Sequence, residues 1–453
     1  MSDSDLLARV KRIHFVGIGG AGMCALAEIM HRRGYRLTGS DVNESDTLAR
    51  VRALGIPIFM GHAAANVDGA ELVVHTAAVH TENVELQEAI RRGIPVMQRS
   101  ELLGLITAEY SSTIAVSGTH GKTTATSMIT QILLSAGLDP TALIGGKLPL
   151  IGGNCRVGGS PLMVCEACEY ADTFLKLHPA ISIILNIDGD HLEYFKTMEN
   201  LIRHFGMFSR LTTRTLIING DDANTLLAVK DSPLKKITFG MGASNDYTAS
   251  GVTVGEKGVI TFSILHCGAR IADIRMRIPG RHNILNALAS CAAAIEAGAS
   301  AADVEKGLNA FTGAGRRFEI LGNVRGVTIA DDYAHHPAEL GATLTAAREM
   351  GYRQVWAVFQ PFTFSRTVML MEDFASVLRI PDRVVLAEIM GSREVNTYNV
   401  FSKDLAEKVP GSVVIPDFDD IAEYVMRNAQ QGDLVITLGC GDIYKAAKRM
   451  LKK

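Results

Sequence analysis

Residues 113–124 read TIAVSGTHGKTT, an apolar run of strand character followed by a glycine-containing turn and the start of a helical pattern. Glycines in such a turn let backbone N–H groups face a phosphate, and the following helix N-terminus adds partial positive charge. Lys122 can neutralise the β- and γ-phosphates, and the Thr123 hydroxyl can ligate Mg²⁺. We therefore interpret the stretch as a phosphate loop, although Val116 stands where the general GxxxxGK[ST] pattern has its first glycine. The expected ATP contacts within it are Gly118, Thr119, His120, Gly121, Lys122, Thr123 and Thr124.

A second glycine-rich turn, GIGGAG at residues 17–22, follows a strand-like run and opens a helical pattern. With Asp41 about 20 residues further on, it is similar to the dinucleotide-binding fingerprint. Taken alone, this turn is compatible with an NAD-dependent oxidoreductase, a nucleotide-sugar binder or a plain packing turn. Two phosphate-binding loops in one chain favour an enzyme that uses ATP and a second, diphosphate-bearing substrate. The candidate contacts to that substrate are Gly17, Gly19, Gly20, Ala21, Gly22 and Asp41.

Acidic and imidazole side chains follow two further apolar runs. Glu166 ends one run, and His191 follows another in a turn that also contains Asp188 and Asp190. Both would lie beside the phosphate loop if the three strands are neighbours in one sheet. Mg²⁺ prefers oxygen ligands, so Glu166 with Thr123 is a chemically sound pair, and a histidine ligand is less common. We expect Thr123, Glu166 and His191 to be the metal-binding residues.

The stretch DDYAHHPAE at residues 331–339 again follows a strand-like run, with Pro337 suited to the first turn of a helix. Its polar, aromatic and imidazole groups favour substrate binding, and the alternative is an aspartate helix cap with exposed histidines. Arg316, Arg317 and Arg366 are candidate clamps for phosphate or carboxylate groups. Each of them, considered singly, is more often a surface cation.

Short β-branched runs alternate with helical patterns along almost the whole chain, which is typical of parallel sheets covered by helices. Only residues 246–278 alternate with a period of two between glycine turns, which predicts a small antiparallel patch. Joints near residues 105–112 and 313–317 predict three domains: residues 1–107, 108–315 and 316–453. We expect an α/β fold with Rossmann-like first and third domains and a phosphate-loop ATPase-like central domain.

The composition restricts the class of protein. The 453 residues include 45 Lys and Arg against 48 Asp and Glu, a net charge of −3 that gives no basic platform for nucleic acid. No signal-peptide-like or membrane-spanning stretch is visible, so a cytoplasmic location is expected. The seven cysteines are too few and scattered for a disulfide framework, and we expect reduced thiols. The pair Cys165 and Cys168 has no second pair to complete a zinc site and indicates packing instead.

Taken in order, the motifs resemble those of the Mur ligase family. They comprise GIGGAGM near the start, SGTHGKTT, the strand ending in Glu166, the turn ending in His191, GRHNILNA at 280–287, GAGRRFE at 313–319, and DDYAHHP. The family's phosphate loop also lacks the first glycine of the general pattern. The resemblance covers essentially the full chain. It implies an ATP- and Mg²⁺-dependent ligase, and the motifs are most similar to those of members that join L-alanine to the lactyl carboxylate of UDP-N-acetylmuramate.

The resemblance also implies roles for individual residues. The glycine loop at 17–22 would hold the diphosphate of a UDP-sugar and not NAD. Lys122 and Thr123 match the family's ATP and magnesium positions, and Glu166 and His191 match its metal-binding positions. The adenine contact region is matched by His282 and Asn283, and the interdomain phosphate contact by Arg316 or Arg317. The turn that meets ATP and the incoming amino acid is matched by Asp331, Tyr333 and His335, with Arg366 as carboxylate partner. The residues expected to act in catalysis are Lys122, Glu166, His191, His335, Arg316 and Arg317.

The sequence departs from the family pattern in two places that bear on the site. Cys168 and Tyr170 replace the usual Asp and Ser after Glu166, and Phe362 and Thr363 stand where relatives often have His and Arg. Only one of two possible arginines therefore remains near the amino-acid site. The alternatives are a ligase that attaches a recycled murein tripeptide, an NAD-dependent oxidoreductase, and a nucleotide-gated interaction protein. Monomer and homodimer are both compatible with the sequence.

Overall fold

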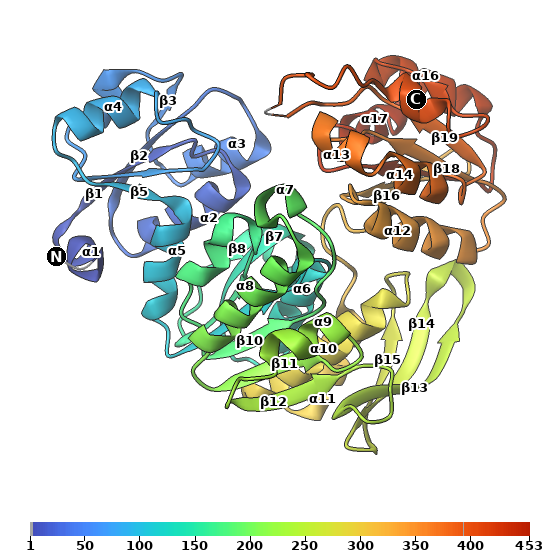
Figure 1. Cartoon of the computed structure of the whole chain (residues 1–453), viewed down its shortest axis with the longest axis horizontal. Coiled ribbons are helices and arrows are strands. Elements are labelled where there is room, and N and C mark those ends of the chain that lie inside the picture. Colours follow the sequence, from blue (N-terminus) through green and yellow to red (C-terminus); the bar gives the residue numbers. More distant parts are fainter. Residues whose placement is uncertain (1–2, 393) are drawn as a thin grey trace. The chain divides into compact units, whose positions relative to one another are not determined.

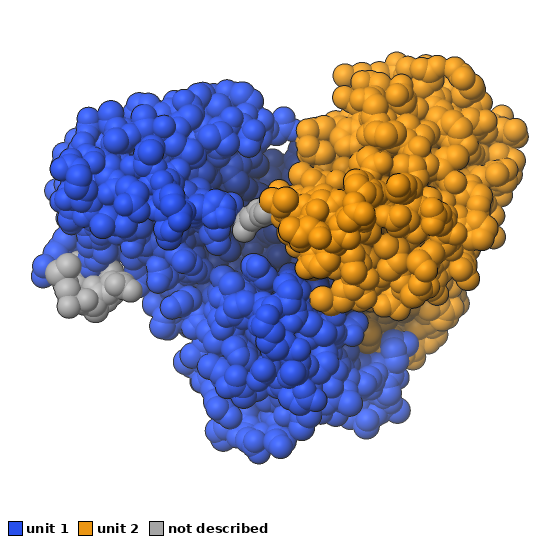
Figure 2. Space-filling model, turned by 45° about the horizontal axis from the view of Figure 1, so that its top comes forward, with its two compact units in different colours: residues 1–247, 289–307 blue, residues 248–288, 308–453 orange. Residues whose placement is uncertain are grey.

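The computed structural model describes residues 3–392 and 394–453, which form two compact units (Figure 2). Unit 1 comprises the described residues up to 247 together with 289–307, and unit 2 comprises residues 248–288 and the described residues from 308 to 453. The chain passes between the units within β13 (Tyr247–Val254), α10 (His282–Glu296) and α11 (Ala301–Ala310). Three largely parallel sheets with flanking helices make up the architecture (Figure 1), as the sequence predicts.

The first sheet of unit 1 has five parallel strands in the order β3-β2-β1-β4-β5. Its strands are β1 (Arg12–Val16), β2 (Arg36–Asp41), β3 (Ile58–Met60), β4 (Leu72–His75) and β5 (Val96–Gln98). The associated helices are α1 (Asp3–Arg9), α2 (Ala21–Arg32), α3 (Asp46–Ala53), η1 (Ala64–Val67), α4 (Val84–Arg91) and α5 (Arg99–Ala108). The chain winds away from β1 in both directions, so the loop after β1 lies at the switch point where such sheets bind ligands.

The second sheet contributes seven strands to unit 1 in the order β12-β11-β10-β6-β9-β7-β8. They are β6 (Ser112–Ser117), β7 (Thr141–Leu148), β8 (Gly153–Arg156), β9 (Leu162–Glu166), β10 (Ile181–Ile184), β11 (Thr215–Asn219) and β12 (Lys235–Phe239). The accompanying helices are α6 (Lys122–Ser135), η2 (Pro149–Ile151), η3 (Tyr170–Lys176), α7 (Leu192–Phe195), α8 (Met198–Leu211) and α9 (Ala223–Val229). All pairs are parallel except β7 with β8. All four residues of β10 are buried, as expected for a strand covered on both faces.

Unit 2 contains the predicted antiparallel ribbon and the third sheet. In the ribbon, β14 (Ile260–His266) pairs antiparallel with β15 (Ala269–Met276), and η4 (Glu256–Gly258) precedes it. Cys267 and Gly268 form its two-residue turn with φ of +50° and +81°, the left-handed geometry that such hairpins favour. The seven cysteines form no disulfide with one another, and Cys267 is exposed.

The third sheet has the order β16-β17-β21-β18-β19-β20, with all pairs parallel except β16 with β17. Its strands are β16 (Glu319–Val324), β17 (Val327–Asp332), β18 (Val355–Phe359), β19 (Arg383–Leu386), β20 (Val413–Val414) and β21 (Leu434–Leu438). Its helices are α12 (Pro337–Glu349), α13 (Phe364–Met369), α14 (Met371–Val377), α15 (Ser402–Ala406), α16 (Phe418–Asn428) and α17 (Tyr444–Met450). Along β18, Phe359 joins the core under α12 and α14, and Trp356 and Val358 join the core under α16 and α17 (Figure 1). Among the described residues, no helix is long and apolar enough to cross a membrane.

Candidate active site

The phosphate loop connects β6 to α6, as the sequence predicts, and two of its glycines are required by geometry. Gly118 has a φ of +137°, and a Cβ there would lie 2.9 Å from Leu185 Cβ. Gly121 has a φ of +88° and stands at the N-cap position of α6, where the described residues provide no side-chain cap. Uncapped N–H groups at a helix N-terminus form a ready anion site. The loop therefore has the backbone that a nucleotide phosphate needs.

The segment after β10 is hydrogen-bonded to this loop. The N–H of Thr119 donates to Asn186 O at 3.0 Å, and the N–H of His120 donates to Asn186 Oδ1 at 2.8 Å. The Thr119 hydroxyl accepts from the Asp188 N–H at 2.9 Å. Sequence reasoning assigned no role to Asn186, although its position just past a buried strand was a usable signal.

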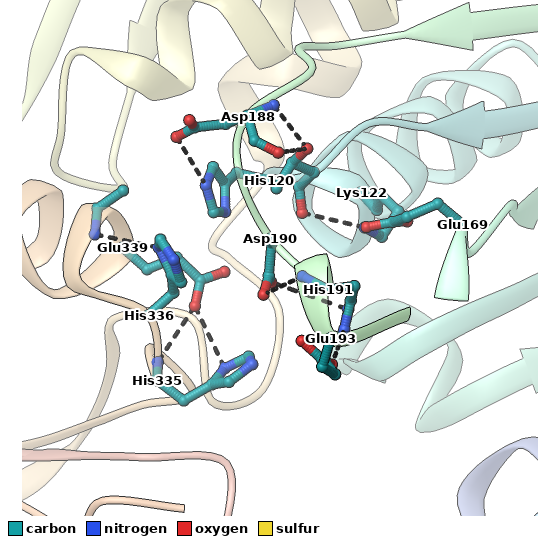
Figure 3. A network of polar contacts seen from close by, with 12 residues as sticks. His120, Lys122, Glu169, Asp188, Asp190, His191, Glu193, His335, His336 and Glu339 are labelled. Atoms are coloured by element: carbon teal, nitrogen blue, oxygen red, sulfur yellow. Dashed lines mark hydrogen bonds and ion pairs between the residues drawn. The ribbon is translucent and has the colours of Figure 1, made fainter. Parts of the chain in front are cut away.

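Lys122 is held by a carboxylate that sequence reasoning missed. Its Nζ donates to Glu169 Oε2 at 2.9 Å and Oε1 at 3.1 Å, and to the carbonyls of Gly118 and Thr119 at 2.5 and 3.0 Å (Figure 3). Burial alone would lower the pKa of the Lys122 amine, but the negative charge of Glu169 outweighs it and the pKa is raised. The ammonium is therefore charged and held over the loop. The signal was a second glutamate three residues beyond Glu166 in the same loop.

Glu166 and the turn containing His191 lie on either side of the phosphate loop, because β9 and β10 both pair with β6. The Glu166 carboxylate accepts from the Gly145 N–H at 2.5 Å, and a Cβ at Gly145 would come within 2.6 Å of that carboxylate. His191 has a φ of +56°, and its Nδ1 lies 3.3 Å from Glu193 Oε1 (Figure 3). The predicted neighbourhood of the three strands is confirmed.

The oxygen donors beside the loop suit Mg²⁺ better than a transition metal. In the described part of the chain, no three His, Cys, Asp or Glu side chains form a cage that could hold an ion by themselves. Mg²⁺ commonly takes only one or two protein oxygens and completes its shell with water and phosphate oxygens. The Thr123 hydroxyl and the Glu166 carboxylate fit that donor set.

The glycine loop after β1 is tied to β2. The N–H groups of Gly17 and Ile18 donate to Ser40 O at 2.8 and 3.0 Å, and the Gly19 N–H donates to Asp41 Oδ2 at 2.8 Å. Gly17 has a φ of +79°, and a Cβ there would lie 2.8 Å from the Thr76 side chain. Asp41 thus shapes the loop through one of its oxygens.

In unit 2, the predicted residues gather at the carboxyl ends of β17 and β21. Arg316 donates from Nε to Asp331 Oδ2 at 2.8 Å and from Nη2 to Gly439 O at 2.6 Å. Its guanidinium lies 5.1 Å from the centre of the Tyr333 ring, and that of Arg317 lies 5.2 Å from the same ring. Burial raises the pKa of the Tyr333 hydroxyl.

His335 Nδ1 lies 3.2 Å from Glu339 Oε2 and 3.1 Å from Tyr333 O (Figure 3). Burial raises the pKa of the Cys440 thiol to about 12, against the opposing positive charge of Arg366, which belongs to α13. Pro337 opens α12, as predicted, with His336 at the N-cap. The cluster combines cations, an imidazole and a phenol, groups that bind phosphate and carboxylate.

Asp332, to which the sequence assigned no separate role, is buried and connects the two motifs of this cluster. Its Oδ2 accepts from the Phe318 N–H and its Oδ1 from the Ala334 N–H, both at 2.7 Å. Burial raises the pKa of its carboxyl to about 6, against the opposing charge of Arg317.

At the start of α10, Asn283 is buried and donates to Pro279 O at 2.7 Å while its Oδ1 accepts from Asn286 at 3.0 Å. The His282 ring lies over Gly280, whose φ is +97° and where a Cβ would lie 2.4 Å from the ring. These contacts fix the shape of the predicted adenine contact region.

Comparison with known proteins gives matches along the whole chain. Three family models match in order: Mur ligase family, catalytic domain, at residues 12–111; Mur ligase middle domain at 116–294; and Mur ligase, glutamate ligase domain, at 316–441. A UDP-N-acetylmuramate–L-alanine ligase of Acetivibrio thermocellus is 44% identical over 98% of this chain and 96% of its own length. A protein of the same name from Caldanaerobacter subterraneus is also 44% identical, over 99% of this chain and 98% of its own length.

Solved structures agree. The UDP-N-acetylmuramate-alanine ligase of Thermotoga maritima superposes with a TM-score of 0.84 at 29% identity, covering 97% of this chain and 98% of that one. A murein peptide ligase of Psychrobacter arcticus superposes with a TM-score of 0.75 at 24% identity, covering 98% of each chain, which is a likeness of fold.

Proposed function

The chain belongs to the Mur ligase family, and on that premise we propose that it joins L-alanine to the lactyl carboxylate of UDP-N-acetylmuramate in peptidoglycan precursor synthesis, with ATP converted to ADP and phosphate. The observation that carries the proposal is the 44% identity, over nearly the full length, to ligases of that name. The phosphate loop with its buried, charged Lys122 supports the use of ATP.

A carboxylate is a poor electrophile, so amide formation requires its activation. We propose that the lactyl carboxylate attacks the γ-phosphorus of ATP, giving an acyl phosphate and ADP, and that the amine of L-alanine then displaces phosphate. Catalysis of such transfers is mostly positioning and charge neutralisation. Lys122 and the uncapped N-terminus of α6 supply positive charge to the ATP phosphates. When bound by Thr123 and Glu166, with His191 nearby, Mg²⁺ would offset further phosphate charge.

Each of the three sheets is proposed to belong to the part of the chain that binds one substrate. We assign residues 1–107 to the UDP-sugar, 108–315 to ATP and metal, and 316–453 to the amino acid, with His282, Asn283 and Asp331 contacting ATP. Tyr333, His335 and Arg366 suit the amino acid, because Arg366 can pair with its carboxylate. We place the reaction in the cytoplasm, where ATP and UDP-sugars are available, and expect a monomer or homodimer without nucleic-acid or membrane partners.

Phosphate release in the presence of ATP, Mg²⁺ and UDP-N-acetylmuramate, with different acceptors, tests the proposal. L-Alanine should support turnover well above glycine, L-serine and the murein tripeptide. Preference for the tripeptide would assign the chain to peptide recycling instead. Phosphate release with no acceptor at all would contradict the ligase assignment.

The Lys122→Ala variant should retain binding of UDP-N-acetylmuramate but lose ATP-dependent phosphate release, because the charge over the phosphate loop is gone. We expect kcat/KM to fall by three or more orders of magnitude, which corresponds to a loss of about 4 kcal/mol of transition-state stabilisation. Lys235→Ala is the matched control, since that lysine forms an exposed pair with Glu296. Wild-type turnover in Lys122→Ala would overturn the assignment of the loop.

A further inference from the structure

A cavity of about 140 Å³ lies in unit 1 between the two sheets. Helices α2 and α5 and strands β7, β8 and β9 contribute to its wall, and α2 lies beside α5 and β8 (Figure 1). Gly22, in the first turn of α2, lines it, and so does Glu166, next to the phosphate loop. The cavity is thus lined both by the glycine loop proposed to bind the UDP-sugar and by a residue next to the ATP site.

Arg99, the first residue of α5, lies in the wall of this cavity against Gly22. A Cβ at Gly22 would lie 3.1 Å from Arg99 Nη1 and 3.3 Å from its Cδ. Gly22 has no left-handed φ, so it is the approach of Arg99 that favours a glycine at this position. Gly22, the last glycine of the loop, thus leaves room for a cation.

The Arg99 guanidinium has no hydrogen-bond or ion-pair partner among the described residues, although it is half-buried. Burial lowers the pKa of Arg99, and an arginine guanidinium stays charged in proteins. A guanidinium carries five N–H donors, and a partly desolvated, unpaired charge is unfavourable unless an anion binds to it. The arrangement therefore favours the binding of an acidic group beside Arg99.

The start of α2 beside this arginine favours the same kind of ligand. In α2, the first helical hydrogen bond runs from the Cys24 N–H to Gly20 O at 2.8 Å, and the described residues provide no side-chain cap. Its first N–H groups are therefore available. Asn154 is 8% exposed and lines the cavity, and its Nδ2 donates to Ala21 O at 3.0 Å, which holds the start of α2 in the cavity wall.

We propose that Arg99 is a substrate-binding residue that grips the diphosphate of the nucleotide sugar against the first turn of α2, with the sugar filling the cavity toward Glu166. The proposal rests on the proposed function for the identity of the sugar. Glu166 is a carboxylate that also lines the cavity, so the anionic diphosphate is favoured beside Arg99. Arginine can donate two parallel hydrogen bonds to a phosphate, which lysine cannot.

The test compares the Arg99→Met and Arg99→Lys variants with wild type in calorimetric binding of UDP, UDP-N-acetylglucosamine and UDP-N-acetylmuramate. Arg99→Met should weaken all three by a similar factor, about 10- to 100-fold, because all three share the diphosphate. The affinity of Arg99→Lys for these ligands should lie between those of wild type and Arg99→Met. In both variants, KM for ATP should stay within about two-fold of wild type. Arg12→Met is the control, because that exposed arginine pairs with Glu71 at 3.0 Å away from the cavity.

Unchanged UDP binding in Arg99→Met would overturn the inference. Weakening confined to UDP-N-acetylmuramate would also overturn it, since Arg99 would then contact the lactyl carboxylate. A purely structural arginine would lower the thermal midpoint on replacement, whereas an unpaired one should not. If Arg99→Met does not fold, Arg99→Lys carries the same comparison. Failure of wild-type turnover would refute the proposed function alone, because UDP binding is measured without turnover.

Discussion

Glu169 illustrates how one carboxylate can set the state of a catalytic lysine. Lys122 is largely buried, and Glu169 is almost completely so. Removing one partner of such a pair leaves an uncompensated charge. A bound nucleotide phosphate would replace the missing negative charge, so the ion pair and the nucleotide should compensate for each other.

We therefore predict that Glu169→Gln lowers the free energy of unfolding by about 3 kcal/mol without nucleotide. ATP should raise the thermal midpoint of this variant by more than it raises that of wild type. Denaturant unfolding and thermal shift with and without ATP measure both effects. The matched control is Glu296→Gln, whose lysine partner is 61% exposed, and its change should stay below about 1 kcal/mol. Equal ATP shifts in Glu169→Gln and wild type would contradict the compensation.

Helix α9 supports the phosphate loop indirectly, through its N-cap residue Asp222. Asp222 caps α9 through the N–H groups of Asn224 and Thr225, and its Oδ2 accepts from the Ile187 N–H at 2.9 Å. Ile187 directly follows Asn186, which holds the loop. A cap on one helix thus fixes the segment that shapes the nucleotide site.

Asp222→Ala should lower stability by about 1 kcal/mol through the lost cap and should raise KM for ATP several-fold. Asp417→Ala is the control, because Asp417 caps α16 in unit 2 through Asp419 and Asp420. That variant should lose its cap and keep KM for ATP. Steady-state kinetics with varied ATP distinguish the two, and an unchanged KM in Asp222→Ala would show that α9 does not position the loop.

Secondary structure and the placement of single motifs were predictable because they depend on local pattern. The apolar runs before Gly118 and the helix from Lys122 to Ser135 follow from the sequence, as does the two-residue alternation of the antiparallel ribbon. The neighbourhood of β9, β6 and β10 followed from parallel-sheet logic. The pairing of Lys122 with Glu169 could not be predicted, because it joins residues 47 positions apart through the irregular segment between β9 and η3.

The grouping of the three sheets was also outside what the sequence could reveal. Unit 1 contains two sheets because α2 docks on β8: the Cys155 thiol donates to Ala25 O at 3.5 Å, and Arg50 bridges Glu28 at 2.7 Å and Cys155 O at 3.2 Å. These partners are up to 130 residues apart in the chain. A Cβ at Gly153 would clash with the Arg50 guanidinium, so this glycine makes room for the bridge.

Arg50→Met should weaken the coupling between the two sheets of unit 1. Calorimetry should then resolve a separate unfolding transition for the N-terminal sheet, with a midpoint at least about 2–4 °C below that of the main transition. Arg52→Met, on the same helix, is the control, because its pair with Glu44 is exposed. A single unchanged transition in Arg50→Met would mean that apolar packing alone joins the sheets.

The turn of the antiparallel ribbon has a practical consequence for spectroscopy. Because Cys267 is the exposed cysteine while Cys24, Cys155, Cys165 and Cys291 are buried, a maleimide dye should react there first in the native protein. The unmodified chain therefore carries its own attachment point for a fluorophore in unit 2. Replacing Cys267 with asparagine, which tolerates the left-handed turn, removes that point without introducing strain.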